Sequence, residues 1–380
     1  GTGCADLGDI LLLPALHTDA LDRNYRAAYD HMRESAEPGY YRVRLNNAIE
    51  VELSATLRCG VQRYTYPSAD TMLTILDLGY GQDDAATECR LTVVNDTLIT
   101  GYRFSTGWAV RQRVYFAMAF SRPIEQWYEQ SAGWSTPNGG LRARRLLAAL
   151  YFGFAGDGDE LLIRTALSPV SEEGALANLR AEAPSQFFET YRSAARRAWN
   201  RELGRIHIDA QSDAQRRIFT TALYHCMIAP NLYQDVDGRY RGGDDRVHHA
   251  TFDHATVFSL WDTYRALHPL FTILDPARVS GWVRSMLAFH DESGLLPVWT
   301  LHANETNCMI GYHSVPVIAD AMLKGIGGFS GEDALTAMKH SAEQTKGGLR
   351  YYQLAEQRSL PDVEKENRAR AKIYDFSWGD

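Results

Sequence analysis

The hydrophobic pattern of the chain changes near Ser171, and this change restricts the possible folds more than any other feature. Before that residue, apolar side chains recur at every second position, as Val43 and Leu45 do, which predicts short β-strands separated by turns. After it, apolar side chains recur at helical spacing, as Leu176 and Leu179 do, which predicts helices. The sequence therefore predicts an antiparallel β-sandwich followed by a helical region.

The two spacings, every second residue for strands and helical spacing for helices, also predict the individual elements. Strands are expected near 41–45, 51–53, 63–66, 71–78, 89–94, 98–104, 110–120, 146–154 and 161–166. Helices are expected from 171 and over 187–199, 214–229, 256–272, 276–291, 314–324, 333–341 and 347–354. Because no buried Val-rich or Ile-rich strand separates successive helices, an (α/α)6-type toroid, incomplete in this chain, fits the pattern better than an α/β sheet.

The length of 380 residues predicts more than one domain, since single cores tend to divide beyond roughly 250 residues. We expect a β-sandwich domain at 1–184 and a linker helix at 185–205. The first part of the helical catalytic domain is expected at 206–380.

Charge and cysteine usage exclude several classes of function. The 47 acidic and 39 basic side chains give a formal net charge of −8 and form no long block of one sign, which argues against a nucleic-acid surface. The five cysteines are widely spaced, so neither a zinc module nor a dense disulfide scaffold is indicated. No apolar run approaches the roughly 20 residues of a membrane span.

The densest group of reactive side chains is the segment 304–314, NETNCMIGYHS, which directly precedes an apolar helix. One carboxylate, Glu305, stands among amides, hydroxyls and an imidazole, and Asn304 and His313 are its polar neighbours. Burial beside aromatic residues would raise the pKa of Glu305, as a sugar-cleaving acid requires. In the simpler alternative, Glu305 only complements the dipole of the following helix.

A second group, Trp261, Asp262 and Arg265, interrupts an apolar helical run. An indole face beside a carboxylate and a guanidinium suits a pyranose, which has one apolar face and several hydroxyls. Asp262 and Arg265 at spacing i and i+3 are equally consistent with a structural ion pair.

Two further segments resemble cation-binding loops. The Asp-x-Asp-Gly run at 235–238 matches only part of an EF-hand, and a tight turn capped by Asp235 explains it equally well. The run from Glu364 to Asn367, which includes Glu366, is either a solvated helix start or a set of ligands for a hydroxyl or Ca²⁺.

Many motifs, in the same order, are similar to those of one known family. They are 1–4 (GTGC), 8–10 (GDI), 38–41 (PGYY), 52–56 (ELSAT), 63–67 (RYTYP), 101–103 (GYR), 107–109 (GWA), 168–171 (SPVS), 229–233 (APNLY), 235–240 (DVDGRY), 258–269 (FSLWDTYRALHP), 305–318 (ETNCMIGYHSVPVI), 319–321 (ADA) and 324–325 (KG). With these motifs the chain resembles the Ca²⁺-dependent exo-α-mannosidases of glycoside hydrolase family 92 over nearly its whole length.

The resemblance implies a β-sandwich and an (α/α)6 barrel, inversion at the anomeric carbon, and a mannose-containing glycan as substrate. It implies Glu305 as general acid, the 261–265 motif as part of the mannose pocket, and Glu366 near the position that selects the linkage. Ca²⁺ is implied as cofactor, with Asn367 the only ligand candidate that can be named. Lys365 stands where α-1,2-cleaving members commonly carry His, which argues against an α-1,2 preference.

The resemblance also implies that the water-activating carboxylate lies beyond Asp380, so we expect the chain to be part of a longer enzyme. Such an enzyme is expected to be periplasmic or extracellular in a bacterium. A non-catalytic mannose-binding protein is the main alternative, and a phosphate-dependent toroid enzyme is a third.

Overall fold

The computed structural model describes residues 8–16, 25–135 and 141–343, and these fall into two compact units. The sheet unit comprises Gly1–Arg241, Asp245–Thr256 and Leu301–Asn304. The helical unit comprises Gly242–Asp244, Val257–Thr300 and Glu305–Asp380. The domain limits predicted from the sequence stay a prediction.

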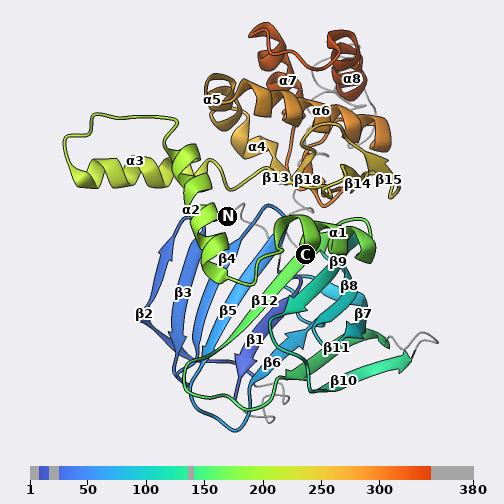
Figure 1. Ribbon diagram of the computed structural model, residues 1–380. Helices are drawn as coiled ribbons and strands as arrows, with labels where there is room; N and C mark the ends of the chain where they lie inside the picture. The colour runs from blue at the N-terminus through green and yellow to red at the C-terminus, as the bar shows by residue number, and fades with distance from the viewer. Residues whose placement is uncertain (1–7, 17–24, 136–140, 344–380) are drawn as a thin grey trace, which may run out of the picture. The chain divides into compact units, whose positions relative to one another are not determined.

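The sheet unit is built on one large antiparallel sheet of 12 strands among the described residues (Figure 1). The strand order is β1-β6-β11-β7-β8-β9-β12-β5-β4-β3-β2, and β10 pairs with β11 outside this path. The strands are β1 (Leu11–Ala15), β2 (Tyr29–Glu37), β3 (Tyr40–Leu45), β4 (Glu50–Ala55), β5 (Cys59–Tyr66), β6 (Leu73–Asp77), β7 (Ala85–Asn95), β8 (Leu98–Thr106), β9 (Gln112–Phe120), β10 (Gln126–Ser135), β11 (Leu141–Tyr151) and β12 (Asp159–Ser168).

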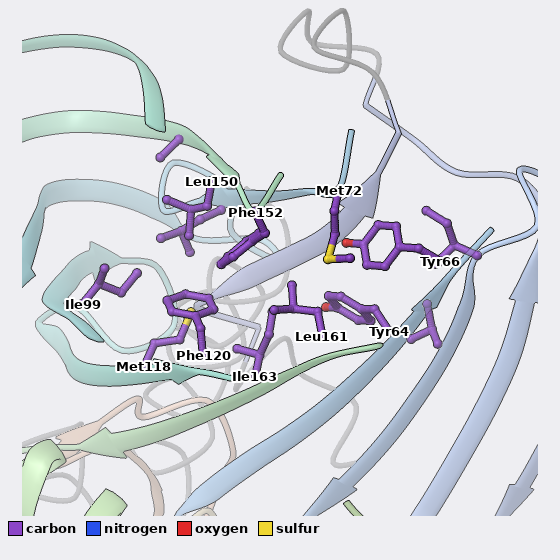
Figure 2. Close-up of a cluster of buried hydrophobic side chains, with 14 of the residues drawn as sticks. Tyr64, Tyr66, Met72, Ile99, Met118, Phe120, Leu150, Phe152, Leu161 and Ile163 are labelled. Carbon is purple, nitrogen blue, oxygen red and sulfur yellow. The ribbon is translucent and has the colours of Figure 1, made fainter. Parts of the chain in front are cut away.

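The sheet is curved, so strands that are far apart in the strand order contribute side chains to one hydrophobic core. Figure 2 shows Leu150 and Phe152, from the region of β11, facing Phe120 of β9 and Ile163 of β12. All four side chains are almost completely buried. The alternating apolar residues of the sequence form this interior, which confirms the predicted antiparallel β domain at the N-terminal end.

Two helices cover part of the outer face of the sheet. These are α1 (Glu172–Glu182) and α2 (Phe188–Leu203), and α3 (Asp213–His225) follows them. Ala175 and Leu179 of α1 and Phe188 and Tyr191 of α2 pack on buried side chains of β5, β9 and β12. The Ser171 hydroxyl caps α1 by accepting from the Gly174 amide at 3.1 Å, which fixes the point where the helical period begins.

Four short strands complete the sheet unit: β13 (Asn231–Leu232), β14 (Arg239–Arg241), β15 (Val247–His249) and β16 (Ala255–Thr256). β13 pairs with β16, and β14 pairs with β15. The turn between β13 and β14 carries Asp235, whose side chain is fully buried.

The helical unit contains α4 (Leu260–Thr263), α5 (Leu267–Leu274), α6 (Pro276–Ser293), α7 (Ser314–Leu323) and α8 (Gly331–Glu343). A small sheet of order β17-β18-β19 runs between them, with β17 (Phe258–Ser259), β18 (Trp299–Leu301) and β19 (Asn304–Glu305). Helix α6 begins with Asp275 as cap and Pro276 in its first turn, and it ends at the left-handed Gly294. The helical region that was predicted is therefore present, and the toroid itself stays a prediction.

The continuous helix predicted at 256–272 is wrong. Val257 has a left-handed φ of 63°, and Phe258 pairs with Thr300 as a strand. Pro269 lacks an amide hydrogen and is tolerated only in the first turn of a helix, so α5 starts at Leu267. The helix predicted at 347–354 lies outside the described residues.

Candidate functional site

Glu305 lies at the end of β19, and its side chain folds back onto the strand before it. One carboxylate oxygen, Oε1, accepts from the amides of Trp299 and Asn307, both at 2.9 Å. The other, Oε2, accepts from the amide of Val298 at 2.8 Å. Backbone amides therefore hold both oxygens of the carboxylate in place.

The pKa of Glu305 is raised above its ordinary value. Burial is the largest cause, because it penalises the charged form, while the backbone amides of Val298, Asn307, Trp299 and Thr306 act in the opposite direction. Burial outweighs the amides, as the sequence predicted. A raised pKa is the direction of shift that suits a general acid.

Strained backbone surrounds this strand. His302 and Ala303 form the two-residue turn between β18 and β19, and both have positive φ, 47° and 64°. That geometry corresponds to a type I′ turn, which normally takes Asn or Gly. Val257 before β17 and Asn307 after β19 are left-handed as well, with φ of 63° and 50°. Non-glycine residues in this region cost roughly 1–3 kcal/mol each and cluster at functional sites.

Trp261, Asp262 and Arg265, the second predicted group, lie close together in the chain. Asp262 and Arg265 each bond to a neighbouring hydroxyl, and not to each other as the ion-pair hypothesis proposed. Asp262 Oδ2 accepts from the Ser259 hydroxyl at 2.5 Å. Arg265 Nε donates to the Tyr264 hydroxyl at 2.6 Å. Trp261 is 45% exposed, so a ligand can reach it.

His313 joins this group through an aromatic stack. Its imidazole lies parallel to the Tyr264 ring, with centroids 4.2 Å apart and an angle of 13° between the planes. Burial and the nearby Arg265 charge lower the pKa of His313. Gly311 permits this position because a Cβ there would lie 2.8 Å from His313 Nε2.

Cys308 connects the two predicted groups. Burial is the main cause of the raised pKa of its thiol, and the charges of Asp262 and Glu305 add to it. The thiol therefore lies within electrostatic range of both carboxylates. Sequence reasoning gave no role to Cys308 or Tyr264, because only the fold brings 262–265 beside 305–313.

The side-chain amide of Asn304, the residue before Glu305, forms hydrogen bonds with the protein backbone. Its Oδ1 accepts from the amide of Arg111 at 3.1 Å, and its Nδ2 donates to the His302 carbonyl at 2.7 Å. The side chain is buried. It anchors the turn before Glu305, and a contact with substrate stays a prediction.

A cavity of about 310 Å³ opens in the sheet unit beside this turn. His302, Thr256, Tyr233 and Gln234 are among its lining residues, as is Asp9. Neither Glu305 nor the side chains of Trp261 and His313 line this cavity.

The predicted calcium dependence stays a prediction. In the part of the chain that the structure describes, no three His, Cys, Asp or Glu side chains are arranged to hold a metal ion. Asp235 is used structurally, since Ser168 Oγ donates to its Oδ2 and Asn178 Nδ2 to its Oδ1, both at 2.8 Å. Glu366 and Asn367 lie outside the described residues.

Family models match both parts of the chain. The model described as the glycosyl hydrolase family 92 N-terminal domain matches residues 1–168, and the family 92 catalytic domain matches residues 174–375. The chain belongs to glycosyl hydrolase family 92. The motifs around Trp261 and Glu305 lie within the match to the family 92 catalytic domain.

Solved family 92 structures share this fold. A family GH92 alpha-mannosidase from Bacteroides thetaiotaomicron is 34% identical, with a TM-score of 0.88, over 93% of this chain and 50% of that protein. A family GH92 inverting mannosidase from the same organism is 30% identical, with a TM-score of 0.79, over 90% of this chain and 48% of that protein. The first of these has also been solved in complex with mannoimidazole.

A curated relative is an uncharacterized secreted glycosidase from Arthroderma benhamiae. It is 25% identical over 255 residues, which is 60% of this chain and 32% of the relative. The chain thus spans about half the length of the solved mannosidases and about a third of this glycosidase. Within the described residues, every helix is too short or too polar to cross a bilayer.

Proposed function

We propose that this family 92 chain belongs to a glycoside hydrolase that removes terminal α-linked mannose from glycans with inversion at the anomeric carbon. The observation that carries the proposal is the carboxyl of Glu305. Backbone amides hold it in a fixed orientation, and burial raises its pKa.

In this mechanism Glu305 protonates the bridging oxygen as the glycosidic bond breaks. A second carboxylate activates a water on the opposite face of the sugar, and the two carboxyl groups of an inverting enzyme stand roughly 6.5–9.5 Å apart. We propose that this base is not among the described residues and, in keeping with the family resemblance, that it lies beyond Asp380.

The side chains of 261–265 and His313 would position the mannose. Trp261 is accessible, and an indole suits the C–H face of a pyranose. Asp262 and Arg265 can form charge-assisted hydrogen bonds with hydroxyls. The stack on Tyr264 keeps the orientation of His313 fixed, so that little side-chain entropy is lost on binding.

Calcium dependence is also proposed, from the family resemblance alone. Among the described residues, no three His, Cys, Asp or Glu side chains are grouped to hold a metal ion, and no step is assigned to Ca²⁺. Location outside the cytoplasm, whether periplasmic or extracellular, is proposed as well, and the name of the secreted relative supports it.

One observation favours a non-catalytic glycan-binding protein instead. Both oxygens of Glu305 already accept backbone hydrogen bonds, which is also how a purely structural carboxylate is held.

Proton NMR of a reacting α-mannoside separates these functions. An inverting mannosidase releases β-mannose first, with α-mannose appearing later by mutarotation. If α-mannose is the first product, inversion is excluded. If the complete protein, including the chain beyond Asp380, binds mannosides without turning them over, the binding protein is the correct assignment.

A further inference from the structure

Two histidines from different helices meet at one edge of the helical unit. His290 lies in the last turn of α6, and His340 lies in the last turn of α8. His290 Nε2 and His340 Nδ1 are 3.1 Å apart, and the two rings are nearly perpendicular, at 87°. The two nitrogen atoms thus lie within hydrogen-bonding distance of each other.

Asp291 determines which nitrogen of His290 is available. Its Oδ1 lies 3.1 Å from His290 Nδ1, and a carboxylate there accepts the Nδ1 hydrogen. The neutral ring then carries an unprotonated Nε2, which is the atom that faces His340. A carboxylate behind a histidine in this way is the usual outer partner of a metal-binding imidazole, because it fixes the tautomer and raises the basicity of the ligand.

The distance between the two nitrogen atoms is close to that found in a metal site. Bonds of about 2.0–2.1 Å from zinc to nitrogen, at tetrahedral angles, place two such atoms about 3.3 Å apart. A hydrogen bond between two neutral imidazoles gives a similar distance, so the distance alone does not decide between them.

The surroundings favour a cation. Both histidines lie at helix C-termini, where the backbone carbonyls carry partial negative charge. The carboxylate of Asp291 is exposed next to the pair, and Glu343 follows His340 at spacing i+3 on α8. His340 itself is exposed, so an ion and its water ligands can reach the nitrogen atoms.

We propose that His290 and His340 form a site for a late first-row divalent cation such as Zn²⁺, with Asp291 as its outer partner. Imidazole ligands suit Zn²⁺, Ni²⁺ and Cu²⁺ rather than Ca²⁺ or Mg²⁺. Two protein ligands leave the remaining positions to water, so the site joins α6 to α8 and is not a closed structural zinc centre. It is separate from the mannoside chemistry proposed for Glu305.

Calorimetry with ZnCl2 and melting in Zn²⁺ against EDTA test the site. The purified protein should bind one Zn²⁺ here, and its melting temperature should rise with the Zn²⁺ concentration, since a ligand that binds only the folded state stabilises it. His340→Ala should abolish both effects. Asp291→Asn should keep the site but weaken binding by about 10–100-fold.

His225→Ala is the matched control, because His225 is also an exposed histidine in the last turn of a helix, α3. It should bind Zn²⁺ like the unaltered protein. If the unaltered protein shows no uptake, or His340→Ala takes up the same amount with the same melting shift, the two rings share only a hydrogen bond and the proposal is overturned.

Discussion

Gly174 illustrates how a single residue supports a buried charge in the sheet unit. It lies in the first turn of α1, against the carboxylate of Asp235. A Cβ at this position would lie 2.2 Å from Asp235 Oδ2 and 2.6 Å from Ser168 Oγ. The hydrogen bonds that compensate for burying Asp235 thus require the absence of a side chain at 174.

We predict that Gly174→Ala destabilises the protein by about 2–4 kcal/mol. The added methyl overpacks the site and separates Asp235 from Ser168, leaving a buried charge poorly bonded. Urea denaturation measures the loss. Gly60→Ala is the control, because nothing lies within 4 Å of a Cβ at Gly60, and equal stability of the two variants would contradict the packing argument.

The sequence was sufficient to predict the direction in which the pKa of Glu305 is shifted, because the neighbouring aromatic and apolar residues imply burial; its catalytic role stays a prediction. The sequence could not show that the amides of Val298 and Trp299 bind the carboxylate. Those contacts depend on how β19 folds back on β18. The stack of His313 on Tyr264 was equally beyond the sequence.

The hairpin of β18 and β19 has His302 and Ala303 in its turn, and both adopt a left-handed backbone conformation that disfavours non-glycine residues. Ala303 has a φ of 64° in a position where glycine is normally preferred. A non-glycine residue there costs roughly 1–2 kcal/mol. The turn is therefore held in place by its surroundings, including the Asn304 side chain.

We predict that Ala303→Gly raises the free energy of unfolding by up to about 1 kcal/mol, because relief of strain exceeds the added freedom of the unfolded chain. The same change at Ala194, an exposed position within helix α2, should instead cost about 1 kcal/mol. Thermal melting of both variants measures the difference. A loss of stability in both would show that the turn at 303 is not strained.

The elements that the sequence predicted well are those with one buried face. In β3 and β7 every second side chain, such as Val43 and Leu45 or Cys89 and Leu91, faces the core. β2 (Tyr29–Glu37) was missed because nearly all its side chains are exposed, so no alternation reveals it. The break between α4 and α5 was missed because apolar residues continue across it, and Pro269 was the available signal.

At the scale of the whole molecule, buried ionisable groups in both units should make stability depend on pH. Burial lowers the pKa of His268 to about 4 and that of His254 to about 3. Burial raises the pKa of Asp9 to about 6, against the lowering effect of Arg103. These shifts have opposite consequences, since a histidine held neutral loses stability on acidification and a carboxyl held neutral gains it.

We predict that His268→Leu becomes more stable relative to the unaltered protein as pH falls from 6.5 to 4, by about 1.4 kcal/mol per pH unit. In that range the unfolded histidine binds a proton that the folded one does not. Asp9→Asn should gain relative stability as pH rises from about 4 to 6. Urea unfolding at several pH values measures both, and parallel curves for all three proteins would contradict the burial of these groups.

We propose that Glu305 donates the proton to the departing sugar oxygen. The most direct measurement is the activity of Glu305→Gln, in the complete enzyme, on α-mannosides with poor and good leaving groups. General-acid catalysis typically contributes about 10²–10⁴-fold, so activity on alkyl and disaccharide mannosides should fall by that factor. An aryl mannoside with a good leaving group should retain most of its rate. Equal loss on both substrates, or no loss on either, would contradict the assignment.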